Sequence, residues 1–346
     1  MLAFLFRRLG WAIVLTFVVA LLTFVIFFVL PSSIHNQTSD RGLDIHAQFD
    51  AQGSIPAQFL HFVRHVALHG DLGQSIQAGV PVTDVLRQRL PVTLSLLLGG
   101  MLLWLLIAFP IGILSALYPR SLLDKGLMVL VVAGASAHAV WVSLLLSYFL
   151  GFKLHWFPIS GYCDFHYHGP NSTSGCGGPK FWAYHLALPW LTYALVFAAL
   201  YARMIRASLL EVLDEDYIRT ARAKGASEAR VVRKHALRNA MLPVITMLGM
   251  DVGIAFAGVL FIETVFELPG IGQQFYWSVR YGDVPVIMGL TLIISFVVVI
   301  ANLILDILYA VVDPRIRASE AASGSLVPAP SRRRRRAGSS AVSESA

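Results

Sequence analysis

The sequence predicts an all-α integral membrane protein with six transmembrane helices. Of its 346 residues, 56% are hydrophobic and only 14% are charged, and the mean hydropathy is +0.67. An ordinary soluble domain carries about a quarter charged residues, so this composition indicates lipid as the main surroundings. Six apolar runs divide the chain, and most of its basic residues lie in connectors on one side of them.

Each apolar run is long enough to cross a bilayer, which takes about 20 residues of helix. Arg7 and Arg8 precede the first run, which exceeds the roughly 7–15 apolar residues of a signal peptide, so we expect it to be retained as a span. Pro110 interrupts the second run, but neighbouring helices can satisfy the carbonyl that it frees. The expected spans cover about 9–30, 92–117, 126–152, 186–206, 240–262 and 284–310.

The distribution of Lys and Arg predicts the orientation. Twenty of the 27 basic residues fall at the two ends and in the connectors 118–125 and 207–239 or at their borders, and seven fall in the remaining connectors. The positive-inside rule therefore places both termini in the cytoplasm and a long extracytoplasmic segment after the first helix. We expect residues 1–317 to form the membrane domain. Residues 318–346, with Arg332–Arg336, have the composition of a disordered basic cytoplasmic tail.

The segment from Glu211 to Pro243 is the long polar stretch between the fourth and fifth spans. It predicts two short helices joined at Gly225, because glycine can adopt the left-handed conformation that ends a helix. Acidic residues at 214–216 suit a helix N-terminus, and Ser227 can cap the second helix. A plain connector needs only a few residues, so this stretch predicts a cytosolic structure with a function of its own.

The chain contains few patterns that are typical of enzymes or metal sites. It contains no GxxxxGK[ST], GxSxG or HExxH motif and no Cys/His spacing for zinc, so we expect neither an enzyme nor a metal site. The basic residues alternate with apolar runs, which excludes a nucleic-acid surface. Cys163 and Cys176 fall on the oxidising side by the charge count, which favours a disulfide over two free thiols.

Ionisable residues inside spans usually face the protein interior or an aqueous path. His138 and Asp251 lie within the third and fifth runs, and Glu263 lies at the end of the fifth. All three are candidates for the wall of a path. For His138, a hydrogen bond to a neighbouring backbone carbonyl is an equal alternative. For Asp251, pairing with a partner helix is an alternative of at least equal weight.

The polar stretch resembles the EAA loop of ABC importer permeases, in the form found in the dipeptide, oligopeptide and nickel branch. Arg219, Thr220 and Ala221 occupy the positions of the general EAA triplet, and Leu237-Arg238 replaces the usual Leu-Pro, departures that this branch shares. The resemblance rests on Asp216-Tyr217-Ile218-Arg219-Thr220-Ala221-Arg222-Ala223-Lys224-Gly225, His235-Ala236-Leu237-Arg238-Asn239-Ala240 and Leu242-Pro243. It implies a site that couples the chain to an ATPase, made of Asp214, Asp216, Tyr217, Arg219, Thr220, Ala221, Arg222, Lys224, Gly225, His235, Arg238 and Asn239.

Further motifs of the same family follow one another over residues 1–317. They are Gly70-Asp71-Leu72-Gly73-x-Ser75, Arg89-Leu90-Pro91-x-Thr93-Leu94, Glu263-Thr264-Val265-Phe266, Pro269-Gly270-Ile271-Gly272, Asp283-Val284-Pro285-Val286, Asp306-x-x-Tyr309 and Asp313-Pro314-Arg315-Ile316-Arg317. The start of the chain and its long first external connector resemble the B-type subunit. The chain departs from the branch at Pro31-Ser32-Ser33-Ile34, at Asp251 and in the length of the segment around the cysteines.

The resemblance implies a permease subunit of an ATP-driven importer in a bacterial-type inner (plasma) membrane. Such a subunit forms the translocation path with a homologous second subunit, is driven by two cytosolic ATPase subunits and receives its cargo from an extracytoplasmic substrate-binding protein. It binds no cofactor itself, because ATP is used by the partner subunits. Di- or oligopeptides are the expected cargo, with nickel or another small solute as the alternative. The competing class is a stand-alone secondary transporter or channel.

Overall fold

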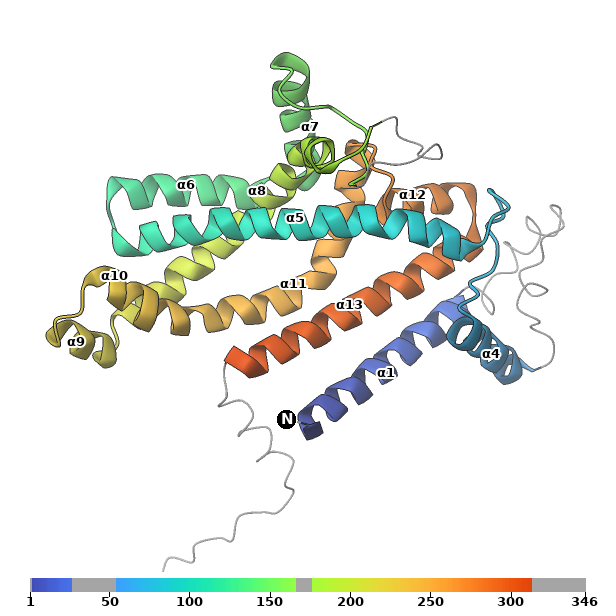
Figure 1. Cartoon of the computed structure of the whole chain (residues 1–346), viewed down its shortest axis with the longest axis horizontal. Helices are drawn as coiled ribbons and strands as arrows, with labels where there is room; N and C mark the ends of the chain where they lie inside the picture. Colours follow the sequence, from blue (N-terminus) through green and yellow to red (C-terminus); the bar gives the residue numbers. More distant parts are fainter. Residues whose placement is uncertain (1, 27–53, 166–175, 313–346) are drawn as a thin grey trace, which may run out of the picture.

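The structure, a computed structural model, describes residues 2–26, 54–165 and 176–312 (Figure 1). The segment 31–34 and the expected tail 318–346 lie outside these ranges. The described part is almost entirely helical, with two isolated β-bridges, Gln74–Pro81 and Asp164–Gly177. Its helices are α1 (Leu2–Phe24), α4 (Ile55–Arg64), η2 (His65–His69), α5 (Val82–Leu117), α6 (Leu122–Ser136), α7 (Ala139–Leu146), η3 (Ser147–Lys153), α8 (Pro179–Leu213), α9 (Asp216–Ala223), α10 (Glu228–Arg230), η4 (Val231–Ala236), α11 (Leu237–Val265), α12 (Ile271–Tyr281) and α13 (Val284–Val312).

Helices α5 and α8 form the centre of the largest hydrophobic core. Trp104 of α5 stacks on Phe197 of α8 with ring centroids 4.8 Å apart, and Tyr193 and Tyr201 of α8 lie within 5.5 Å of the same ring. All four rings are at most 9% exposed. Aromatic pairs of this kind each contribute about 0.5–1.5 kcal/mol beyond the burial of their area. The cluster therefore fixes the two helices relative to each other.

The two ends of α5 pack in two different hydrophobic clusters. Ala116, near its C-terminus, packs in one cluster with Ile218 of α9, whereas Val82, its first residue, packs with Ile271 of α12. A helix of this length is about 50 Å long. The α9–α10 segment and α12 therefore lie at opposite ends of the bundle (Figure 1).

Three helices in the described part are long and apolar enough to cross a membrane, and the number rises to five if each of two bent pairs is one span. The three are Val82–Leu117, Pro179–Leu213 and Val284–Leu305. The first run supplies a shorter apolar helix, Leu9–Phe24, which is part of α1. Helices α5 and α8 begin before the apolar runs that predicted them, since hydropathy detects only the apolar part of a helix.

The third run departs from the expected continuous helix over 126–152. Ala137 and His138 have extended backbone, with ψ of 127° and 140°, and the helices on either side meet at 104°. The Nδ1 atom of His138 accepts a hydrogen bond from the N–H of Val140 at 3.4 Å and so caps α7. The fifth run also bends, by 59° between Asp251 and Gly253. Periodicity in apolar residues does not reveal such bends, because both halves remain apolar.

Candidate functional site

The polar stretch between the fourth and fifth spans begins directly after α8. Asp214 is the C-cap of α8 and Glu215 is the N-cap of α9, so two residues separate these helices. Asp214 therefore ends α8, whereas the sequence analysis assigned it to the start of the next helix. Asp216 lies in the first turn of α9 and Arg222 in its last turn, as the helix dipole favours.

A Schellman motif ends α9 at Gly225. This residue has the expected left-handed conformation, with φ of 79°. Its N–H donates to the carbonyl of Arg222 at 2.9 Å, and the N–H of Ala226 donates to the carbonyl of Ala221 at 3.3 Å, the two bonds that define the motif. A Cβ at Gly225 would meet nothing within 4 Å. Glycine is therefore required here by the backbone conformation and not by space.

The stretch has two arms: α9 is the first, and the segment that begins with α10 is the second. The second arm runs without interruption into the fifth span. Ser227 occupies the N-cap position of α10 but makes no side-chain capping bond, and α10, η4 and α11 then follow one another directly. Arg222 Nε and Glu228 Oε1 join the two arms at 2.9 Å, although both side chains are exposed and such surface pairs contribute little. A movement of the second arm is therefore a movement of α11.

A small hydrophobic cluster, which we name the loop anchor, holds α9 against the bundle. Its fully buried members are Ile218 of α9, Leu209 of α8, and Val231, Ala236 and Ala240 of the second arm, joined by Ala116 of α5. Burying an isoleucine side chain contributes about 1.5–3 kcal/mol. The anchor therefore connects the short helix to three long ones.

The residues expected to form the coupling site lie mainly on the outer surface of this structure. Tyr217 is 40% exposed, and its hydroxyl oxygen accepts a hydrogen bond from Asn239 Nδ2 at 2.8 Å, which ties the arms together on the outside. Ala221 and His235 are partly buried. The exposed members are Asp214, Asp216, Tyr217, Arg219, Thr220, Arg222, Lys224, Gly225, Arg238 and Asn239. The stretch thus presents a charged face on an apolar anchor.

An ion pair that the sequence analysis missed connects the preceding helices. Arg206 of α8 donates from two nitrogens to the two carboxylate oxygens of Asp124, each at 2.8 Å. Asp124 also accepts from Ser115 Oγ and from the N–H of Arg120. The pattern Ser121-x-x-Asp124 at the start of α6 was the available signal, because the Ser121 hydroxyl caps the N–H of Asp124. The pair fixes the α5–α6 turn to α8.

Glu263, one of the three path candidates, is a fully buried structural group. Thr93 Oγ1 donates to its carboxylate at 2.6 Å, and the N–H of Gln273 does so at 3.0 Å. Thr93 in turn accepts from the N–H of Ile271 at 2.8 Å, so both side chains cap the N-terminus of α12. A Cβ at Gly270 would overlap the carboxylate of Glu263. Glycine is therefore required at this position, because the carboxylate lies so close to the backbone.

Thr93, Glu263 and Gly270 belong to three different motifs that the sequence analysis treated separately. The cap on α12 brings these three motifs together. Asp283 likewise joins two further sequence motifs. Its carboxylate accepts from Ser75 Oγ at 2.5 Å and from the N–H of Ile76 at 3.1 Å. The segment before α5 is thereby fixed to the start of α13.

The other two path candidates lie in different surroundings. Asp251 is 8% exposed, and Tyr201 Oη donates to its Oδ2 at 2.8 Å. His138 is exposed at the break between α6 and α7, and its ring forms a T-shaped pair with Phe261, with ring centroids 5.5 Å apart. The structure does not bring His138, Asp251 and Glu263 into one site.

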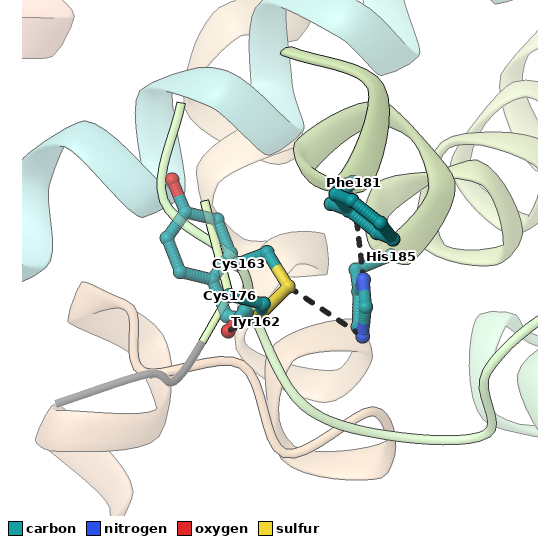
Figure 2. The surroundings of a disulfide bond; sticks show 5 residues. All are labelled: Tyr162, Cys163, Cys176, Phe181 and His185. Atoms are coloured by element: carbon teal, nitrogen blue, oxygen red, sulfur yellow. Dashed lines mark hydrogen bonds between the residues drawn. A yellow bond between two sulfur atoms is a disulfide. The ribbon is translucent and has the colours of Figure 1, made fainter. Parts of the chain in front are cut away.

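Cys163 and Cys176 form a disulfide (Figure 2). His185 Nδ1 donates a hydrogen bond to the carbonyl of Phe181 at 2.9 Å, because a carbonyl oxygen can only accept. The Nε2 atom of His185 lies 3.8 Å from the sulfur of Cys163. Burial raises the pKa of the neighbouring Tyr162 hydroxyl above its usual value. The bridge closes the segment that leads into α8.

The described part of the chain is a bundle of apolar helices with a charged two-armed loop at one end. Residues 108–318 match the family described as binding-protein-dependent transport system inner membrane component, and residues 1–97 match its N-terminal counterpart. The chain belongs to this family. It is 35% identical over 339 residues to the dipeptide transport system permease protein DppB of Escherichia coli (strain K12), covering 92% of this chain and 99% of that one. It is 36% identical over 334 residues to the di/tripeptide transport system permease protein DppB of Pseudomonas aeruginosa (strain UCBPP-PA14), again covering 92% and 99%.

Proposed function

We propose that this chain is a permease subunit of an ATP-driven peptide importer. The observation that carries the proposal is the charged outer face of α9, held by the loop anchor on three bundle helices. The dipeptide and di/tripeptide permeases that the chain resembles over 92% of its length support peptides as the cargo. Nickel or another small solute is the alternative.

The energy for transport would enter through α9. Two separate ATPase subunits use ATP, and this chain binds no cofactor. One of them receives the exposed face of α9 (Asp216, Tyr217, Arg219, Thr220 and Arg222) together with Asp214 and Lys224 at its two ends. Because Ile218 packs on α5, α8 and the second arm, a displacement of α9 is transmitted to these helices. The Schellman turn at Gly225 keeps the angle between the arms constant during this movement.

The membrane arrangement that fits this role has six spans with both termini in the cytoplasm. The charge count supports a cytoplasmic position for α9. Helix α12 lies at the other end of the bundle, where an extracytoplasmic substrate-binding protein would deliver the cargo. A homologous second permease completes the path as a heterodimer. We propose Asp251 and His138 as residues of the path, whereas Glu263 contributes by holding α12 in place.

Reconstitution tests the proposal. The chain is expressed with its neighbouring-gene products, purified, and placed in liposomes with the binding protein outside. We expect an ATPase pair and a second permease to co-purify, and labelled alanyl-alanine to enter only when ATP is present. Uptake by this chain alone without ATP would identify a secondary transporter or channel instead. ATP-dependent uptake of Ni²⁺ that dipeptides do not inhibit would favour the nickel alternative.

A further inference from the structure

The second arm carries four cations outside the face of α9 that is proposed to receive the ATPase. Their side chains are all exposed, and we name them the basic row: Arg230, Arg233, Lys234 and Arg238. Within the described part of the chain, none of them forms an ion pair. No Asp or Glu occurs in residues 229–250, so the arm supplies no neighbouring counter-charge along this stretch.

The cations of the first arm differ from the basic row, because acidic residues lie beside them. Arg222, for example, pairs with Glu228 at 2.9 Å. In the basic row, Arg230, Lys234 and Arg238 follow one another at intervals of four positions. This spacing brings like charges close together on a helix, which is destabilising. The row is therefore complementary to an anionic partner that lies outside the described part of the chain.

The second arm lies beside the end of a membrane span. Its buried residues Val231, Ala236 and Ala240 pack in the loop anchor with Ala116, the second-last residue of α5. Helix α5 is long and apolar enough to cross a membrane. Just after it, Leu122 is 87% exposed, which suits an apolar side chain against lipid. Since α10 lies at this same end of the bundle (Figure 1), the arm is level with the boundary between hydrocarbon and headgroups.

This position suits the long side chains of the basic row. Lys and Arg lay their apolar stems along apolar surface while the charged group reaches the aqueous interface. Because α10, η4 and α11 follow one another directly, the row immediately precedes the fifth span. Basic clusters at such positions bind anionic headgroups, and each cation strengthens the attraction about fivefold.

We propose that the basic row binds the phosphate groups of anionic phospholipids. The guanidinium groups of Arg230, Arg233 and Arg238 donate hydrogen bonds to phosphate oxygens, and Lys234 adds a further positive charge. The contact holds the second arm on the bilayer surface and thereby fixes the start of α11. A lipid surface is favoured over an ATPase subunit because the loop anchor sets the arm level with the end of α5. The proposal goes beyond peptide import, since it requires only that the chain spans a membrane.

The test places a fluorescent label on the second arm of the assembled importer in lipid vesicles. Ala229→Cys supplies an exposed thiol beside the row, the two natural cysteines are joined in a disulfide, and the cysteines of the other subunits are replaced. Both leaflets contain a fixed share of phosphatidylcholine with a spin label on its headgroup, which quenches the fluorophore on contact. Adding phosphatidylglycerol should increase the quenching. Salt at about 1 M should reverse the increase, because it shortens the Debye length to about 3 Å.

Arg233→Gln together with Lys234→Gln should abolish this response to phosphatidylglycerol. The matched control, Arg87→Gln together with Lys153→Gln, also removes two exposed cations but lies outside the second arm, so it should retain the response. Three results would overturn the proposal: no response in the labelled complex with the row intact, equal responses of the two double variants, and a label that meets the quencher only after the ATPase subunits are removed. The last would assign the row to the ATPase. Peptide uptake by the same vesicles tests the proposed function separately, and its absence would contradict that function without changing the quenching result.

Discussion

The turn at Gly225 allows the coupling proposal to be tested through backbone conformation alone. With φ of 79°, the residue is in the left-handed region, and a Cβ added there would meet nothing within 4 Å. A substitution therefore changes the conformational energy without a steric clash. The left-handed conformation costs an L-residue about 1–2 kcal/mol, and a β-branched residue more.

This magnitude predicts a graded series. An increase of about 1–2 kcal/mol raises the open population of the turn roughly 5- to 30-fold. We expect Gly225→Ala to show this change, Gly225→Val to exceed it, and Gly225→Asn to remain close to the unaltered protein, because asparagine tolerates the left-handed region. Gly126→Ala is the control: its Cβ also meets nothing within 4 Å, but its backbone is helical, so alanine should be neutral or slightly stabilising.

Two assays report the result independently. Hydrogen exchange of residues 216–236 in the purified complex measures opening of the turn and does not depend on the transport function. Peptide uptake per ATP hydrolysed in proteoliposomes measures coupling, which should fall in the order Asn, Ala, Val while membrane insertion is retained. Unchanged exchange in Gly225→Val, or equal damage by Asn and Val, would refute the conformational argument. Normal exchange with lost coupling would assign Gly225 to the contact with the ATPase.

Three further predictions follow from buried contacts. Ile218→Ala should destabilise the loop anchor by about 2–5 kcal/mol and expose α9 to hydrogen exchange, whereas Tyr217→Phe, which removes one exposed hydrogen bond, should change exchange little; similar effects of the two would contradict the anchor. Asp124→Asn weakens a partly buried bidentate ion pair and should cost on the order of 2–3 kcal/mol in thermal unfolding of the detergent-solubilised complex, so an unchanged melting temperature would speak against its role. Cys163→Ser opens a loop with a sequence separation of 13 and should cost about 3 kcal/mol; a reductant should then lower the melting temperature of the unaltered protein but not of the variant, and equal sensitivity would argue against the bridge.

Local features of the candidate site followed well from the sequence. A glycine after a helix with basic residues in its last turn predicts a left-handed turn, because few other residues adopt that conformation, and Gly225 does so. The helix boundary was less accurate, because Asp214 suits the end of one helix and the start of the next almost equally, and α8 extends to Leu213.

Contacts between distant residues did not follow from the sequence. Glu263 was a path candidate because an acidic residue next to an apolar run is unusual. Its partners, Thr93 and Gln273, are 170 and 10 positions away, and only the fold brings them together at the start of α12. The pair of Asp124 and Arg206 was missed for the same reason, since the two residues are 82 positions apart in the sequence.

The sequence by itself determined that the chain is a helical membrane protein and that its basic loop turns at Gly225, because apolar length and glycine chemistry are local properties. The tertiary structure decided where the loop is attached, how the third and fifth spans bend, and which groups hydrogen-bond to Asp251 and Glu263. These depend on which helix faces pack together, and every face of these helices is almost equally apolar. In lipid, apolar side chains alone do not distinguish an inner face from an outer one, so the packing of Trp104, Tyr193 and Ile218 had to be observed.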